Sequence, residues 1–152
     1  MADESSVVFN EAHPPQDKAI DAFQTVEKKI KSEILASRKR WDGHEPRMYS
    51  RAAGISDADL VNFNIEKDLV EVRAGPTTYG VILLGKIKLP AIKDDLGEGF
   101  IHVRIHDPPN RGTEDVVFHS LFTDEGKRDG DGRAERYQAI QTKDFPLEYF
   151  HE

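Results

Sequence analysis

The sequence predicts an α+β fold in which a long N-terminal helix packs across an antiparallel meander sheet of about 4–6 strands. The first observation is a run of apolar residues spaced three and four apart between Asp17 and Trp41, which is typical of a helix with one buried face. The second is a change to alternating apolar and polar residues beyond Arg47, which is typical of strands. Strands that follow one another directly in the chain favour antiparallel pairing. We leave open whether the sheet curls into a half-barrel.

Composition narrows the class of protein. The chain has 152 residues, a formal net charge of -7 and no cysteine. This length suits one domain, which we expect over residues 14–152 after a flexible acidic tail at residues 1–13. The lack of cysteine excludes disulfide scaffolds, thiolate metal sites and cysteine nucleophiles. No apolar run approaches the roughly 20 residues that span a bilayer.

The acidic balance bears on partners and location. At a pI near 5.4 the protein is repelled at long range by nucleic acid and by anionic membranes. We therefore expect a soluble protein without a membrane partner, and nucleic acid is disfavoured as a ligand. The predicted location is the cytoplasm, and entry to the nucleus is left open.

The expected helix begins near Asp17, which lies at the positive end of the helix dipole. Its apolar stripe consists of Ile20, Phe23, Ile30, Ile34 and Trp41. Basic residues 38–40 lie near the negative end, and Asp42 and Gly43 supply a stop. A helix of roughly 25 residues would be about 37 Å long, enough to cross a small sheet. Lysine and arginine residues make one half of this helix basic, and we expect a solvated face there, since Glu27 and Glu33 interrupt the basic run. The alternative is a surface that binds nucleic acid or serves as a nuclear address.

The strand candidates share short length and alternating or uniformly apolar character. They are residues 61–65, 70–73, 80–89, 100–106, 116–123 and 136–143. The segment from Gly80 to Leu89 is apolar on both faces in its first half, which predicts a central strand covered on both sides. Gly85 is a candidate bulge, and Pro90 is expected to end the strand. The segment before these candidates, Ser56 to Leu60, is alternatively one helical turn capped by Ser56.

The segment IHVRIHD, residues 101–107, carries the most distinctive chemistry. Because side chains alternate along a strand, His102, Arg104 and His106 share one face. Alternation in the following strand places His119 beside Arg104 on that face. One interpretation is a basic, histidine-lined surface for an anion, with a histidine as general acid or base. The other is a solvated polar face, which antiparallel sheets commonly have.

On the first interpretation, the candidate catalytic residues are the three histidines of this face, His102, His106 and His119. The candidate ligand-binding residues are cations and one hydroxyl donor: Arg104, Arg111, Lys86 and Tyr79. Arg111 lies in the DPPNRG loop, residues 107–112, which is stiffened by two prolines. That loop is a hairpin connection, or else it presents Arg111 to a partner protein.

Metal binding is not expected. His102 and His106 are four residues apart on a strand, which is about 13 Å, too far to share one zinc ion. The loop at residues 124–133 has part of the acidic spacing of a calcium loop, but Glu135 comes too early to close it. The sequence therefore predicts no metal and no cofactor.

The aromatic C-terminus has two interpretations. Tyr149 and Phe150 pin the end of the chain to its own core, or they form a docking motif for another protein. No phosphate-binding loop, nucleophile elbow or catalytic triad is recognisable in the sequence. We expect a non-catalytic protein-binding or adaptor module whose partner is another protein or a small anionic molecule. The alternative is a small-molecule binder or a cofactor-free acid-base enzyme on the His/Arg sheet face; catalysis and oligomeric state are left open.

Overall fold

The computed structural model describes residues 8–43, 45–77, 80–94, 97–108, 116–123 and 138–150 of the chain. Its helices are α1 (Asp17–Thr25), α2 (Glu27–Asp42), the 3-10 helix η2 (Pro46–Ala52), α3 (Asp57–Leu60) and α4 (Ile65–Asp68). Its strands are β1 (Leu69–Thr77), β2 (Gly80–Asp94), β3 (Gly97–Asp107) and β4 (Val117–Leu121). Among these residues, no helix is long and apolar enough to cross a membrane.

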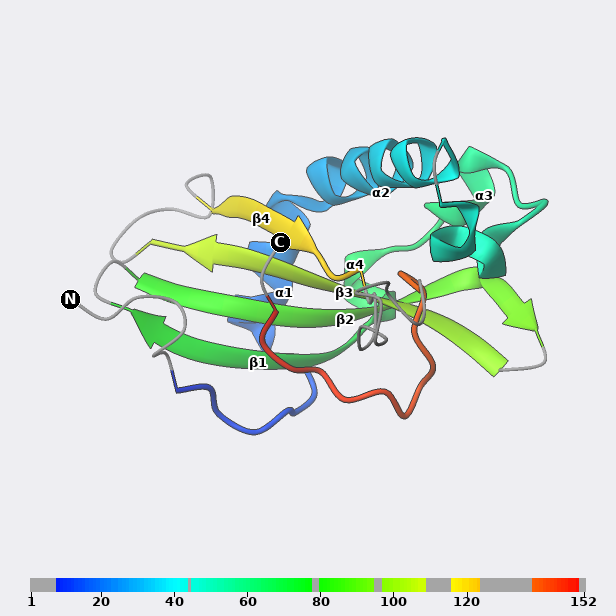
Figure 1. The fold of residues 1–152 in the computed structure, drawn as a ribbon. Coiled ribbons are helices and arrows are strands. Elements are labelled where there is room, and N and C mark those ends of the chain that lie inside the picture. The colour runs from blue at the N-terminus through cyan, green and yellow to red at the C-terminus, as the bar shows by residue number, and fades with distance from the viewer. Residues whose placement is uncertain are drawn as a thin grey trace, which may run out of the picture.

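The four strands form one open antiparallel sheet in the order β1-β2-β3-β4, as Figure 1 shows. The prediction of an α+β fold with an antiparallel sheet is confirmed. The apolar strand at Gly80 is central, with β1 on one side and β3 on the other. It continues past Pro90 to Asp94, and its pairing with β3 shifts register between Leu89 and Lys93.

The expected long helix is replaced by two helices that meet at Val26. The backbone of Val26 has φ -106 and ψ 13, outside helical values, although the sequence there contains neither glycine nor proline. The hydroxyl of Thr25 donates to the carbonyl of Asp21 at 2.9 Å, and such a bond back to the preceding turn bends helices. Val26 is also β-branched, which lowers its helix propensity. The predicted start at Asp17 and end at Asp42 are confirmed.

The expected strand at residues 61–65 is wrong, because this part of the chain links two short helices. Ser56 caps α3, and its side chain accepts a hydrogen bond from the backbone of Asp59. Asn64 caps α4 in the same way, with Lys67 as donor. The buried side chains of Phe63 and Ile65 alternate in sequence without forming a strand. The alternative interpretation of one helical turn capped by Ser56 is confirmed.

The main core lies between the helices and one face of the sheet. It includes Phe23 and Ile30 from the helices, and Ile87 and Val103 from the central strands. Gly85 is not a bulge, since β1 and β2 stay in register there. A Cβ atom at Gly85 would lie 2.5 Å from Cζ of Phe23, so glycine allows α1 to approach the sheet closely.

The opposite face of the sheet is covered by the later part of the C-terminal segment (residues 138–150), which passes in front of the strands in Figure 1, while α1 lies behind them. Ala139 and Ile140, near the start of the segment, belong to the main core. This segment contains isolated bridges but no regular strand, so the strand expected at residues 136–143 is absent from its described part, 138–143. Asn10 and His13, which belong to the expected flexible tail, are hydrogen bonded to the edge of β1. The backbones of His13 and Val72 bond to each other in both directions, at 3.0 and 2.8 Å.

Candidate functional site

The predicted His/Arg face lies beneath the C-terminal segment rather than in solvent. Register places Lys86 directly opposite His102, and Leu84 directly opposite both Arg104 on β3 and Arg73 on β1. Side chains in register share a face, so three adjacent strands contribute cations to one surface. We call the surface formed by Arg73, Lys86, His102 and Arg104 the basic face. The solvated-face interpretation is wrong for its centre, because Lys86, His102 and Arg104 are all buried.

The cations of the basic face bind main-chain oxygens of the C-terminal segment. Lys86 Nζ donates to the carbonyls of Lys143 at 2.9 Å and Phe145 at 2.7 Å. Arg104 donates to the carbonyl of Phe150 at 2.7 Å. Arg73 donates to the carbonyl of Leu147 at 2.9 Å. The segment is therefore held by its backbone, which any peptide sequence would offer.

Apolar contacts fix the position of the same segment. Leu147 is 2% exposed and Phe150 is 6% exposed, and both pack against Ile82 and Leu84 of β2. Phe122, which follows β4, extends this small cluster, with its ring centroid 5.3 Å from that of Phe150. The prediction that the terminal aromatics pin the chain end to its own core agrees with these contacts. The two buried side chains are three positions apart, and together they form an apolar anchor.

Arg104 also contacts an aromatic hydroxyl of the segment. Its guanidinium lies 3.2 Å from the hydroxyl oxygen of Tyr149 and 5.5 Å from the centroid of that ring. Phe9, from the N-terminal residues, contacts the ring of Tyr149 at a centroid distance of 5.6 Å and lies 5.9 Å from the guanidinium of Arg73. The N-terminal residues and the C-terminal segment therefore meet over the basic face.

His102 is the most unusual side chain of the basic face. It is 1% exposed and contacts Phe122 and Phe145 at ring-centroid distances of 5.9 and 5.7 Å, and these two rings lie 5.8 Å from each other. Burial, and then the charge of Lys86, lower the pKa of His102 to about 3, so the ring is neutral near pH 7. Its Nε2 atom has no hydrogen-bond partner among the described residues. A base this weak is poorly matched to proton transfer near neutral pH.

Lys86 experiences the same burial. Removal from water is the main cause that lowers the pKa of Lys86, and the carboxylate of Glu71 opposes this effect from 3.8 Å. Its ammonium is otherwise engaged by the two carbonyl oxygens of the C-terminal segment. In this arrangement Lys86 serves as a donor to the peptide backbone.

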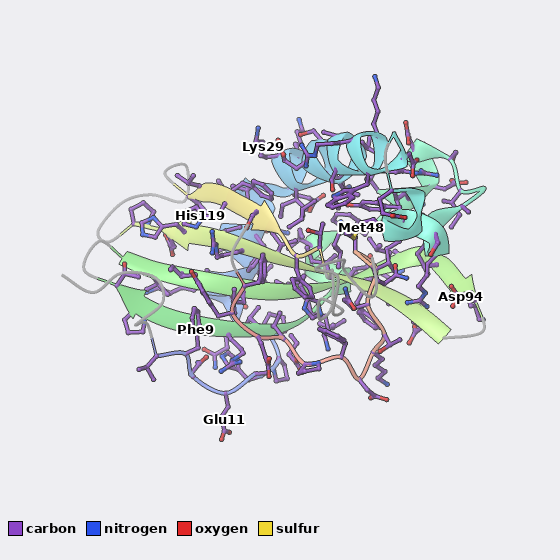
Figure 2. The ribbon with its side chains drawn as sticks, in the orientation of Figure 1. Phe9, Glu11, Lys29, Met48, Asp94 and His119 are labelled. Carbon is purple, nitrogen blue, oxygen red and sulfur yellow. The ribbon has the colours of Figure 1, made fainter. Side chains whose placement is uncertain are left out.

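His106 and His119 form a separate pair near the end of the sheet. Their ring planes are parallel within 2° and their centroids are 5.7 Å apart. The expectation that His119 lies beside Arg104 is wrong, because a register shift in the β3–β4 pairing places Ser120 opposite Arg104. Figure 2 shows His119 on β4, at the opposite end of the sheet from Asp94. In the described part of the chain, no three histidines, aspartates or glutamates are grouped to hold a metal ion.

Two of the predicted ligand-binding residues, Tyr79 and Arg111, lie outside the described residues. The sequence analysis missed Arg73, although the alternation of Val70 and Val72 with Glu71 and Arg73 already placed it on the polar face of β1. What the sequence did not indicate was a partner for that face. The carbonyl acceptors belong to residues 46 to 74 positions away, so only the fold brings them to the cations.

A surface hollow lies outside the sheet, between α2 and α3. It has a volume of about 530 Å³ and is lined by Leu35, Ala36, Arg38, Lys39, Asp42 and Asp57. Its central cation, Arg38, donates to the carbonyls of Ala52 at 3.0 Å and Ile55 at 2.6 Å. It also pairs with Asp57 at 3.3 Å. These contacts give Arg38 a structural role in holding the loop after η2.

The fold and the basic face define an α+β protein whose antiparallel sheet holds a peptide segment across the face opposite its helices. Comparison with protein-family models gives no match, and no curated protein and no solved structure matches the chain significantly. Function is therefore inferred from the contacts of this chain alone.

Proposed function

We propose that the chain is a non-catalytic protein-binding module, and that it binds a peptide segment of its partner across the basic face. The observation that supports this is the set of hydrogen bonds from Arg73, Lys86 and Arg104 to main-chain carbonyls. Cations on three adjacent strands make this surface a receptor for a peptide backbone. In the structure the chain's own C-terminal segment is the peptide.

Affinity and selectivity come from different parts of such a surface. Hydrogen bonds to carbonyls accept any sequence, whereas apolar pockets select particular side chains. Here the pockets hold Leu147 and Phe150, and they are formed by Ile82, Leu84 and Phe122. A partner segment therefore needs two large apolar side chains at the same spacing of three.

The C-terminal segment competes with any partner, because it belongs to the same chain. A tethered segment has an effective concentration of about the millimolar range, so a free peptide of equal affinity must reach a comparable concentration to displace it. The module would accordingly bind weakly to simple peptides and more strongly to a partner that adds contacts. Partner binding would release the residues around Leu147 and Phe150.

The test uses the full chain and a fluorescent peptide of residues 142–152. We expect saturable binding that becomes at least about tenfold tighter when Phe150→Ala weakens the tethered competitor, since about 1.4 kcal/mol is a factor of ten. A peptide with Leu147→Ala and Phe150→Ala is the matched control and should not bind. If the unmodified peptide fails to bind both the natural chain and the Phe150→Ala chain, the proposal is wrong.

The alternative of a small-molecule binder or acid-base enzyme stays a prediction. The low pKa of His102 and the backbone partners of Lys86 and Arg104 do not favour it. A small anion would have to displace the C-terminal carbonyls before it could reach either cation.

A further inference from the structure

We propose that the partner segment carries a hydrogen-bonding side chain where the C-terminal segment carries Phe145, so that the partner satisfies His102 and the chain's own segment is a weaker stand-in. This inference rests on the proposed function of the basic face. The partner sequence would then be a polar side chain, one residue of any kind, a large apolar side chain, two residues of any kind, and a second large apolar side chain.

The observation that carries this inference is the unsatisfied nitrogen of His102. The side chain is 1% exposed, and its Nε2 has no hydrogen-bond partner in the part of the chain that the structure describes. Buried polar groups in native proteins are nearly always paired, and a specific exception calls for an explanation such as a binding role. The residues around the His102 ring therefore indicate where a hydrogen-bond partner for Nε2 is missing.

On the side of the C-terminal segment, His102 contacts an aromatic ring. The ring of Phe145 lies 5.7 Å away and tilted by 59°, and the ring of Phe122 lies 5.9 Å away and nearly parallel. Phe122 belongs to the sheet side of the interface, whereas Phe145 belongs to the exchangeable segment. Replacing the segment thus replaces the group that faces His102 at this point.

The rest of the segment is well matched to the same surface. Phe145 supplies its carbonyl to Lys86 at 2.7 Å, and Leu147 and Phe150 fill their pockets to 2% and 6% exposure. The backbone contacts and both anchors are in place, and the side chain of the segment that contacts His102 offers it no hydrogen-bonding group. A partner segment that keeps these contacts and places an amide or hydroxyl beside His102 would bind more tightly than the chain's own segment.

The experiment is a double-mutant cycle between the peptide and the full chain. Peptides of residues 142–152 with phenylalanine or with Phe145→Asn are titrated by NMR into the natural chain and into a His102→Leu chain. Asparagine loses the contact of Phe145 with Phe122 in both chains, and the tethered segment competes equally with both peptides, so these two effects cancel in the ratio of the two Kd values. The contact of Phe145 with residue 102 differs between the chains, and a second readout therefore reports on the hydrogen bond itself.

We expect the preference for the asparagine peptide to be at least about fivefold greater on the natural chain than on His102→Leu, because only His102 can hydrogen bond to the amide. Equal preferences on the two chains would overturn the inference and leave the proposed function standing. Failure of both peptides to bind either chain would overturn the proposed function and this inference with it.

A second readout needs no substitution in the chain. The ¹⁵N chemical shift of His102 Nε2 should move when the asparagine peptide binds the natural chain, and should stay close to its starting value when the phenylalanine peptide binds. A shift of the same size with both peptides would count against the inference even if His102→Leu failed to fold.

Discussion

Lys86 and His102 lie directly opposite each other on β2 and β3, and burial under the C-terminal segment lowers the pKa of both. The charge of Lys86 is the second cause of the low pKa of His102, after burial. The pair tolerates burial because His102 is neutral and the ammonium of Lys86 is bound by two carbonyl oxygens. The stability of the basic face thus depends on pH through His102, and on the C-terminal segment through Lys86.

The pH dependence of stability follows from His102. Its pKa is lowered from 6.5 to about 3, so between these values the unfolded chain binds a proton that the folded chain does not. The free energy of unfolding is therefore not reduced by His102 above about pH 6.5. As the pH falls from there towards pH 3, it decreases by about 1.4 kcal/mol per pH unit. Urea unfolding at pH 7 and pH 5 should show a smaller loss of stability in His102→Leu than in the natural chain. Equal losses in the two chains would contradict the low pKa.

Lys86 should control the attachment of the C-terminal segment. Lys86→Met keeps the length and apolar stem of the side chain but leaves the carbonyls of Lys143 and Phe145 without their donor. We expect a cost of about 1–3 kcal/mol, concentrated in this segment. Hydrogen exchange followed by mass spectrometry should therefore show faster exchange over residues 138–150.

The matched control is Lys88→Met, two residues further along the same face of β2. Lys88 pairs with Glu98 at 2.6 Å, and its side chain is 37% exposed, so its loss should change exchange in the C-terminal segment little. Faster exchange of the segment in both variants, to the same extent, would show that the hydrogen bonds of Lys86 have no special role there.

Gly85 should be intolerant of any side chain because of Phe23. A Cβ atom would lie 2.5 Å from Cζ of Phe23, and Phe23 is fully buried and cannot move into solvent. We expect Gly85→Ala to destabilise the protein by about 1–3 kcal/mol through overpacking. Adding Phe23→Leu should recover part of that loss, so the double variant is more stable than the sum of the single changes predicts. Strict additivity in urea unfolding would argue against this contact.

The sequence predicted the fold class because its periodicities are determined by local geometry. Alternation located β2 and β3 and assigned His102 and Arg104 to one face, and the register adds Lys86 to that face. The break at Val26 was not predictable in the same way, because Thr25 and Val26 also occur within continuous helices. The strand predicted around Phe63 is wrong because buried residues in a short loop can alternate by chance.

The environment of the basic face could not be read from local pattern. Alternation indicates which side chains share a face, but it does not say what covers them. The covering segment begins more than thirty residues after His102, and its carbonyls carry no sequence signal that marks them as acceptors for Arg73 or Arg104. The misplacement of His119 has a similar origin, since a single bulge between Phe118 and Ser120 changes which residues oppose β3.

Arg51 offers the sharpest test of how the far end of the sheet is held. Its side chain is 4% exposed and pairs with both carboxylate oxygens of Asp94, at 2.8 and 2.9 Å. It also donates to the carbonyls of Gln141 at 3.1 Å and Gly97 at 2.9 Å, so one guanidinium joins η2, β2, β3 and the C-terminal segment. Arg51→Lys keeps the charge but loses the planar fork, and we expect a loss of about 3 kcal/mol in urea unfolding. The same change at exposed Arg40 should cost little, and a similar cost at both positions would mean that the contacts of Arg51 contribute nothing beyond charge.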